Sequence, residues 1–174
     1  MAENYGLPLQ KVTFALAFWL ASTAPGIADD AQCVENTRAY AHEICEALKA
    51  QGLPLELSML AVAESCGKPH AVSSKGAAGL WQLMPFIARH YGVEDRHDPS
   101  DASRGAAAYL ASLYRRFHSI QWTVAAYNAG GHNLKRATGY RKGMSIEEAR
   151  AFPAAYALAR HVQHLIDEFG TLCE

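Results

Sequence analysis

Glu64 is the residue whose type and spacing best suit acid–base chemistry. It lies seven, four and three residues after Leu57, Leu60 and Ala61, so it falls on the apolar face of a predicted helix. A carboxyl group on that face is desolvated, and desolvation raises its pKa because it disfavours the charged form. Such a group stays protonated near neutral pH, as a general acid must. The alternative is a glutamate at the helix end that hydrogen-bonds the following loop.

The stretch 67–85, which follows Glu64, is rich in Gly, Ser, Pro and Ala. It predicts an ordered loop, because several of its apolar residues must be buried. Gly76 and Gly79 suit positive φ angles. Gln82 lies among apolar neighbours and needs a polar partner, which a ligand could supply. A small hairpin within residues 70–80 is compatible with this composition.

Several separately spaced motifs in the centre of the chain resemble, in order, the signature of one enzyme family. The family is that of the lytic transglycosylases with the soluble-lytic-transglycosylase (SLT) domain, especially its membrane-bound D-type branch. The resemblance covers roughly residues 53–137. Its motifs are Glu64-Ser65, Pro69-His70-Ala71-Val72-Ser73, the run from Gly76 to Pro85, Ala88-Arg89-His90-Tyr91-Gly92, the helix from Asp101 to Phe117, and Ala125-Ala126-Tyr127-Asn128-Ala129-Gly130.

The resemblance implies a mainly α, goose-type lysozyme-like domain with a substrate cleft, in which Glu64 is the catalytic acid. It also implies the substrate, which is the β-1,4 bond between N-acetylmuramic acid and N-acetylglucosamine in peptidoglycan. No cofactor and no metal are implied. The residues that match glycan-binding positions of the family are Ser73, Gln82 and Met84, together with Tyr127 and Asn128 opposite the catalytic carboxyl group.

Some of these residues also have a purely structural interpretation. Trp81 and Met84 more often belong to a core than to a sugar-binding surface. Tyr127 lies on an alanine-rich helix, where an aromatic ring usually packs, although its hydroxyl could reach Glu64. Asn128 stands just before the end of that helix and could be a helix-end residue.

The number of carboxyl groups indicates the reaction. Inverting and double-displacement glycosidases need two of them at the scissile bond. We expect the other candidates, Asp95, Asp98 and Asp101, to be capping residues of a turn-rich stretch. Glu64 alone would protonate the departing glycosidic oxygen and then deprotonate the C6 hydroxyl of the muramic sugar, which closes a 1,6-anhydro ring without water.

Two alternatives to this reaction remain. A muramidase on the same fold would keep Glu64 and deliver water to the bond. A non-catalytic peptidoglycan-binding module of a secretion or assembly machine would keep the cleft without the reaction, although such a module has no need of a buried acid.

Helical periodicity and capping residues predict a mainly α domain over residues 29–174, with no strand series, internal repeat or domain linker. Ser145, with Glu148 three residues later, predicts a capping box. The expected helices run over residues 34–51, from Pro54 to Cys66-Gly67, from Pro85 to near Gly92, from Asp98 to Phe117, from Trp122 to Asn128 with closure at Gly130-Gly131, and from Pro153 to Gly170.

The beginning of the chain predicts export. Lys11 precedes the apolar run 12–22, and small residues follow, which is the order of a signal peptide over residues 1–28. Cleavage is expected after Ala28, with Ala24 as the alternative site, and a buried first helix is the competing interpretation. Cys33 follows polar residues rather than a Leu-x-x-Cys arrangement, so we expect a periplasmic protein without a lipid or other stable membrane anchor.

An even number of cysteines in an exported chain indicates disulfides. Three pairings are possible, and the alternative is that some cysteines are free and buried. Cys66-Gly67-Lys68 departs from the residues that often follow the Glu-Ser pair in the family, and a disulfide there could hold the wall of the cleft. The four cysteines are Cys33, Cys45, Cys66 and Cys173.

Charge and histidine spacing exclude other classes of partner. The 16 basic and 17 acidic residues give a formal net charge of -1, which predicts no nucleic acid partner and no polybasic membrane anchor. His161 and His164 lie one turn apart, but without a third ligand at metal spacing we expect hydrogen-bonded or solvated histidines. The resemblance implies glycan strands as the partner, and short members of the family often serve secretion, conjugation or flagellar machines.

Overall fold

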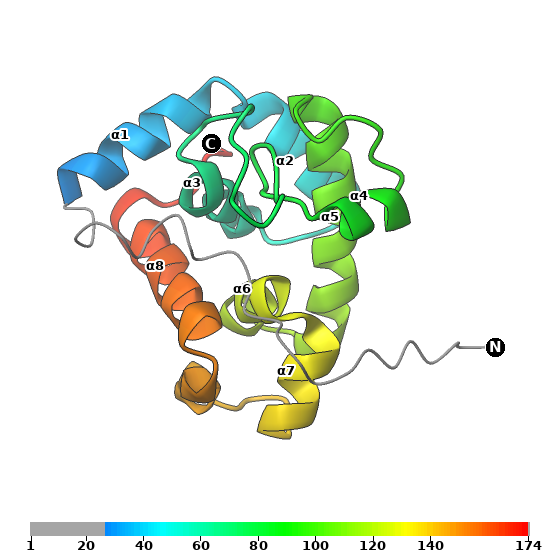
Figure 1. Cartoon of the computed structure of the whole chain (residues 1–174). Helices are drawn as coiled ribbons and strands as arrows, with labels where there is room; N and C mark the ends of the chain where they lie inside the picture. Colours follow the sequence, from blue (N-terminus) through cyan, green and yellow to red (C-terminus); the bar gives the residue numbers. More distant parts are fainter. Residues whose placement is uncertain (1–26, 174) are drawn as a thin grey trace.

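Helices make up the regular structure of residues 27–173, which are the residues that the computed structural model describes (Figure 1). This agrees with the predicted mainly α class. Two isolated antiparallel bridges, Val72 with Ala78 and Ala78 with Leu83, stand where a small hairpin was considered. The elements are α1 (Ile27–Arg38), α2 (Ala41–Ala50), the 3-10 helix η2 (Leu55–Ser58), α3 (Met59–Ser65), α4 (Pro85–His90), α5 (Pro99–Phe117), α6 (Ile120–Ala129), α7 (Gly131–Thr138), the 3-10 helix η3 (Ile146–Ala151) and α8 (Pro153–Phe169).

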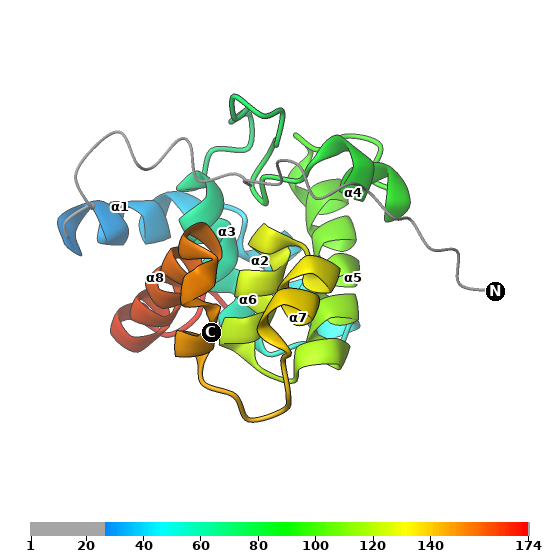
Figure 2. The same cartoon turned by 60° about the horizontal axis from the view of Figure 1, so that its bottom comes forward.

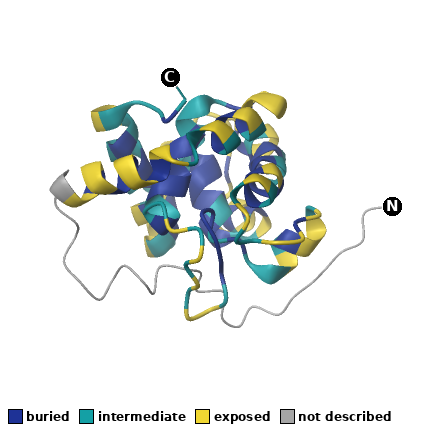
Figure 3. Cartoon of the chain, turned by 90° about the horizontal axis from the view of Figure 1, so that it is seen from above, coloured by how far each residue is buried: buried dark blue, intermediate teal, exposed yellow. Residues whose placement is uncertain are grey.

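The helix α6 forms the centre of the domain. Seven of its ten residues are buried, as expected for a helix that is largely apolar on every side. It packs against α8, α5 and α7 (Figure 2). Figure 3 shows the buried residues gathered in the middle of the molecule, with the exposed residues around them. The core therefore surrounds the helix that carries Tyr127 and Asn128.

The long helix α5 begins and ends as its sequence predicts. The side chain of Asp98 accepts a hydrogen bond from the Asp101 amide over 2.7 Å, and Pro99 occupies the first turn. His118 ends the helix in the left-handed conformation. No helix within residues 27–173 combines the length and the apolar character that crossing a bilayer requires.

The single helix predicted over residues 34–51 is wrong, because the chain turns between α1 and α2. The amide of Tyr40 bonds to the carbonyl of Thr37 over 2.9 Å at this turn. The two helices face different partners, since α1 packs on α3 and α8 whereas α2 packs on α5 and η2. Local periodicity does not reveal such a change of partner.

Two further expectations in the second half of the chain need correction. Gly130 ends α6 as predicted, but Gly131 begins α7, whose start lies against the side chain of Leu113. A Cβ on Gly131 would lie 2.8 Å from that leucine, so the second glycine allows close packing rather than closing a helix. Ser145 accepts from the amide of Glu147 over 3.3 Å and not from that of Glu148, because a 3-10 helix follows instead of a capping box.

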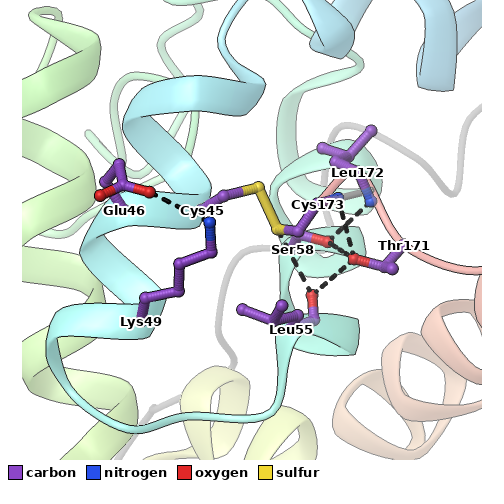
Figure 4. The surroundings of a disulfide bond; sticks show 8 residues. All are labelled: Cys45, Glu46, Lys49, Leu55, Ser58, Thr171, Leu172 and Cys173. Carbon is purple, nitrogen blue, oxygen red and sulfur yellow. Dashed lines mark hydrogen bonds and ion pairs between the residues drawn. A yellow bond between two sulfur atoms is a disulfide. The ribbon is translucent and has the colours of Figure 1, made fainter.

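Both possible disulfides form, and no cysteine among the described residues is free. Cys33 of α1 bonds to Cys66, and Cys45 of α2 bonds to Cys173 (Figure 4). The predicted oxidation of the four cysteines is confirmed in the structure, and the pairing is now defined. The predicted signal peptide lies outside the described residues except for residues 27 and 28, which belong to α1, so cleavage after Ala28 would fall within that helix.

The second disulfide holds the end of the chain against η2 and the start of α3. Next to Cys173, the hydroxyl of Thr171 donates to the carbonyl of Leu55 over 3.0 Å. The amide of Leu172 donates to the hydroxyl of Ser58 over 3.1 Å (Figure 4). The segment that leads into α3 is therefore fixed by both a covalent bond and hydrogen bonds.

Candidate active site

Glu64 lies in the last turn of α3, on the one side of that helix that is not fully buried. The preceding residues 59–62 and the following Ser65 are buried, whereas Ala63 and Glu64 keep part of their surface exposed. The helix ends at Cys66, which adopts the left-handed conformation with φ 53° and donates its amide hydrogen to Val62 over 2.9 Å. The carboxyl group thus lies at the end of an otherwise buried helix and keeps part of its surface exposed.

Burial raises the pKa of Glu64 from 4.5 to about 8. Desolvation is the cause, and no charged group of the described residues contributes to the shift. The carboxyl group is therefore mostly protonated at neutral pH, as the position of Glu64 in the sequence predicts. Because the side chain is partly exposed, this acidic proton is within reach of a bound molecule.

The electrostatics of Tyr127 link it to Glu64. Burial raises the pKa of Tyr127 well above its usual range, and the charges of Glu64 and Tyr109 add to the rise. The hydroxyl of Tyr127 donates to the carbonyl of Trp81 over 2.7 Å. The loop carbonyl therefore takes the hydroxyl's only donated hydrogen bond, whereas the hydroxyl oxygen can still accept one.

The loop between α3 and α4 uses its polar side chains to maintain its own shape. The hydroxyl of Ser73 accepts from the amide of Ala77 over 3.0 Å. Nε2 of Gln82 donates to the carbonyls of Ala71 and Gly79, over 3.2 and 3.0 Å. Both bonds of Gln82 involve its amide nitrogen, so Oε1 has no donor among the described residues and can accept one from a ligand.

Gln82 also has an unusual backbone conformation, with φ 46°. This left-handed conformation costs energy for any residue other than glycine. The following Leu83 is buried, and half-buried Met84 precedes the first turn of α4. At this turn the side-chain amide of Gln82 bonds back to the loop, whereas the next residue, Leu83, is buried in the core.

Arg96, which the sequence analysis did not single out, holds the two halves of this loop together. Its Nη1 donates to the carbonyls of Gly76 and Leu83, over 2.6 and 2.9 Å. Its own carbonyl lies so close to Gly79 that a Cβ there would be 1.8 Å away, which explains the glycine. The position of an arginine among capping aspartates could have indicated a structural role for Arg96. Its carbonyl partners, however, were not predictable from local spacing.

Two other candidate residues, Trp81 and Asn128, are buried. Trp81 is fully buried and its indole nitrogen donates to Ser103 over 2.9 Å, so the core interpretation of Trp81 is confirmed. Asn128 is buried at the end of α6, and no hydrogen bond within residues 27–173 joins it to Glu64.

Three tyrosines form a row that begins beside Glu64. The ring centroids of Tyr127 and Tyr109 lie 5.1 Å apart, and those of Tyr109 and Tyr91 lie 5.4 Å apart. All three rings are partly exposed. Tyrosine presents an apolar ring and a polar hydroxyl, which suits ligands that have both kinds of surface.

The three aspartates considered as second carboxyl groups serve as capping residues. Besides the bond from Asp98 that begins α5, Asp101 accepts from the amides of Glu94 and Asp95, each over 2.8 Å. Asp95 accepts from the amide of His97 over 2.8 Å. The predicted capping roles are confirmed, so these carboxylates have backbone partners of their own.

The histidine pair of α8 contacts an acidic residue of α1. His161 and His164 lie 3.1 and 3.7 Å from the carboxylate of Asp30. His161 is within hydrogen-bond distance of Asp30 and His164 is only within ion-pair distance, which agrees with their interpretation as hydrogen-bonded or solvated histidines. Within residues 27–173, no group of three or more His, Cys, Asp or Glu side chains has the arrangement of a metal site.

Residues 43–149 match the transglycosylase SLT domain, which is well over half of the chain. The chain belongs to this family. The resemblance inferred from the sequence motifs is thereby confirmed, and the mainly α domain is the lysozyme-like fold of an SLT domain. The matched range extends from α2 into η3, so it contains Glu64, the loop and Tyr127, whereas α1 and α8 lie outside it.

Three relatives illustrate the similarity. Membrane-bound lytic murein transglycosylase D of Escherichia coli K12 is 33% identical over 117 residues, which are 62% of this chain and 26% of that protein. Membrane-bound lytic murein transglycosylase F of Maricaulis maris is 38% identical over 110 residues, 57% of this chain and 24% of that protein. A putative tributyltin chloride resistance protein of an Alteromonas strain is 34% identical over 105 residues, 56% of this chain and 51% of that protein. The SLT domain described here therefore spans a quarter to a half of these relatives.

Proposed function

We propose that this SLT domain protein is a peptidoglycan lytic transglycosylase in which Glu64 is the single general acid and base. The observation that carries the proposal is a partly exposed carboxyl group whose pKa is raised to about 8 by burial alone. The names of two relatives, both lytic murein transglycosylases, support the same substrate. The bond to be cleaved is the β-1,4 linkage from N-acetylmuramic acid to N-acetylglucosamine.

In the first step, the protonated carboxyl group of Glu64 gives its proton to the oxygen that links the two sugars. The bond between that oxygen and C1 of the muramic sugar breaks, and the N-acetylglucosamine leaves with a hydroxyl group. Positive charge develops at C1, where the substrate's own N-acetyl oxygen and nearby backbone carbonyls stabilise it. The raised pKa of Glu64 ensures that the proton is present at neutral pH.

In the second step, the Glu64 carboxylate removes the proton from the C6 hydroxyl of the muramic sugar. The C6 oxygen attacks C1 and closes a 1,6-anhydro ring. Glu64 regains the proton that it gave away, so the reaction consumes no water. One carboxyl group is sufficient for both steps, which agrees with the capping roles of Asp95, Asp98 and Asp101.

We assign the glycan cleft to Ser73, Gln82 and Met84 on the loop and to Tyr127 and Asn128 on α6. Gln82 supports this assignment because its Oε1 accepts no hydrogen bond from the described residues and suits a sugar hydroxyl or amide. Tyr127 supports it because its ring lies beside Glu64 and begins the row of tyrosines.

Mass spectrometry of the soluble products from purified sacculi tests the proposed reaction. We expect 1,6-anhydromuropeptides, which are lighter by one water than hydrolysis products. Products with reducing ends alone would identify a muramidase on the same fold, and no soluble product together with retained binding to sacculi would identify a binding module. Either outcome would refute the transglycosylase mechanism.

The proposed location is the periplasm, after export through the predicted signal peptide. Two disulfides support an oxidising compartment, in which such bonds persist. We further propose that the enzyme opens the wall locally, in the service of a secretion, conjugation or flagellar machine. Fractionation of cells with an antibody against the protein tests the location, and release with the cytoplasmic fraction would contradict it.

A further inference from the structure

The disulfide between Cys33 and Cys66 reaches the site from outside the matched family range. Cys66 follows Glu64 by two residues and ends α3. Cys33 belongs to α1, which precedes residues 43–149. The helix that carries Glu64 is therefore bonded covalently to an element that the family match does not include.

A second contact joins α1 to the same point. The backbone of Gly67 packs against Asn36 of α1 so closely that a Cβ on Gly67 would lie 2.6 Å from the Asn36 carbonyl carbon. Gly67 also has φ 72°, which disfavours other residues. Nδ2 of Asn36 lies 3.9 Å from Sγ of Cys66. The chain immediately after Glu64 is thus fitted against α1 over two successive residues.

The short helix α3 needs such support. A helix of seven residues has few internal hydrogen bonds and is not stable by itself, so its geometry depends on tertiary contacts. Its first turn is supported by Ser58, whose hydroxyl accepts from the amide of Leu172 near the other disulfide. At its last turn, where Glu64 lies, the covalent support is the bond from Cys66 to Cys33.

We propose that the Cys33–Cys66 disulfide is a positioning device for Glu64, and that it makes turnover depend on oxidation of this one bond. The inference rests on the proposed function. Loss of the bond releases the last turn of α3 from α1, and the carboxyl group then samples orientations in which it does not face the glycosidic oxygen. Catalysis is sensitive to such displacement, since about 1 Å can cost on the order of 100-fold in rate.

Reduction of the Cys33–Cys66 disulfide inactivates the enzyme. A dithiol such as dithiothreitol transfers two electrons and two protons to the disulfide, which yields the Cys33 and Cys66 thiols, and the dithiol closes to its own cyclic disulfide. A chain that has not yet been oxidised would be in the same state. The enzyme is then poorly active until it reaches an oxidising compartment.

The chain offers a matched control for the test. Cys33→Ser with Cys66→Ser removes the bond beside Glu64, whereas Cys45→Ser with Cys173→Ser removes the bond at the start of the η2–α3 segment. A third variant, Gly67→Ala, keeps both disulfides and pushes α1 away from the end of α3. Digestion of purified sacculi, binding to them and the thermal midpoint Tm are measured for each protein.

For the first pair of substitutions we expect kcat to fall by about 10- to 100-fold with little change in KM, because orientation and not glycan binding is lost. The alkaline limb of the pH–activity profile should also move to lower pH, since a freed carboxyl group is better hydrated. The control pair should lower Tm but keep kcat and the pH profile close to those of the wild type. Gly67→Ala should lower kcat in the same way as the first pair.

Three results would overturn the inference. The first is an unchanged kcat and pH profile in the folded variant that lacks Cys33 and Cys66. The second is an equal loss of kcat in both disulfide variants. If the first variant does not fold, the third is an unchanged kcat for Gly67→Ala. A wild-type protein that does not digest sacculi at all would instead refute the proposed function, so the two failures are distinguishable.

Discussion

Tyr127 donates its hydroxyl hydrogen to the backbone carbonyl of Trp81 over 2.7 Å. The bond joins the central helix α6 to the loop between α3 and α4. Burial holds the pKa of Tyr127 well above its usual range, so the phenol keeps its proton at physiological pH. The attachment of this loop to α6 therefore depends on a neutral donor.

Tyr127→Phe should weaken both stability and catalysis. The variant leaves the Trp81 carbonyl without its donor, which costs about 1–3 kcal/mol of the free energy of unfolding. Because the loop loses its attachment to α6, we expect kcat/KM to fall by about 10-fold as well. Urea denaturation and sacculus digestion measure the two effects. Tyr114→Phe is the control, since its hydroxyl donates no bond to the loop, and an equal loss in both variants would contradict the prediction.

Glu64→Gln should abolish most of the activity while the fold persists. The amide keeps the shape of the side chain but has no proton for the departing oxygen, so turnover should fall by at least about 100- to 10,000-fold. Binding to sacculi should remain. A variant that still cleaves at nearly the wild-type rate would move the acid elsewhere, with Asp98 and Asp101 as the first candidates, and a variant that does not fold would make Glu64 a structural residue.

The activity of the wild-type enzyme should fall on the alkaline side. The general acid acts in its protonated form, and burial raises the pKa of Glu64 to about 8. We therefore expect kcat/KM to decrease as the pH rises through about 8, with one proton lost. Initial rates on sacculi between about pH 3 and pH 10 test this, and a Tm measured at each pH excludes unfolding as the cause. A decline centred near pH 4.5 would mean that the carboxyl group is not desolvated.

The same group makes stability depend on pH. The folded protein keeps the Glu64 proton up to about pH 8, whereas the unfolded chain releases it near 4.5. The folded state thus binds more protons between these values, so this group's contribution to stability falls as the pH rises through that window. Glu64→Gln removes this dependence, and the stability of the variant relative to the wild type should increase with pH. A constant difference between pH 4 and pH 8 would contradict it.

The two disulfides should contribute unequally to stability. The sequence separation is 33 residues for Cys33–Cys66 and 128 for Cys45–Cys173. Restriction of the unfolded chain predicts about 4 kcal/mol for the shorter loop and about 5 kcal/mol for the longer one. Denaturant unfolding of the two paired serine variants measures both contributions, and a larger loss at Cys33–Cys66 would show that native-state packing of α1 outweighs chain entropy.

Local spacing was sufficient to predict the helical class and the raised pKa of Glu64. Leu57 belongs to η2 rather than to α3, but Glu64 follows the buried Leu60 and Ala61 by four and three residues, and this spacing predicts a desolvated carboxyl group. The N-terminal cap of α5 was also a local feature, since Asp98 and Asp101 stand three residues apart. Such features depend on residues within about one helical turn of each other, so they can be predicted without knowledge of distant partners.

Which distant groups meet depends on how the helices pack on one another. The pairing of Cys33 with Cys66 and the hydrogen bond from Tyr127 to Trp81 join residues whose separation along the chain carries no period. Arg96 likewise reaches the carbonyls of Gly76 and Leu83 across the loop. These contacts arise because packing of one helix on another selects partners by shape and burial, which local spacing does not encode.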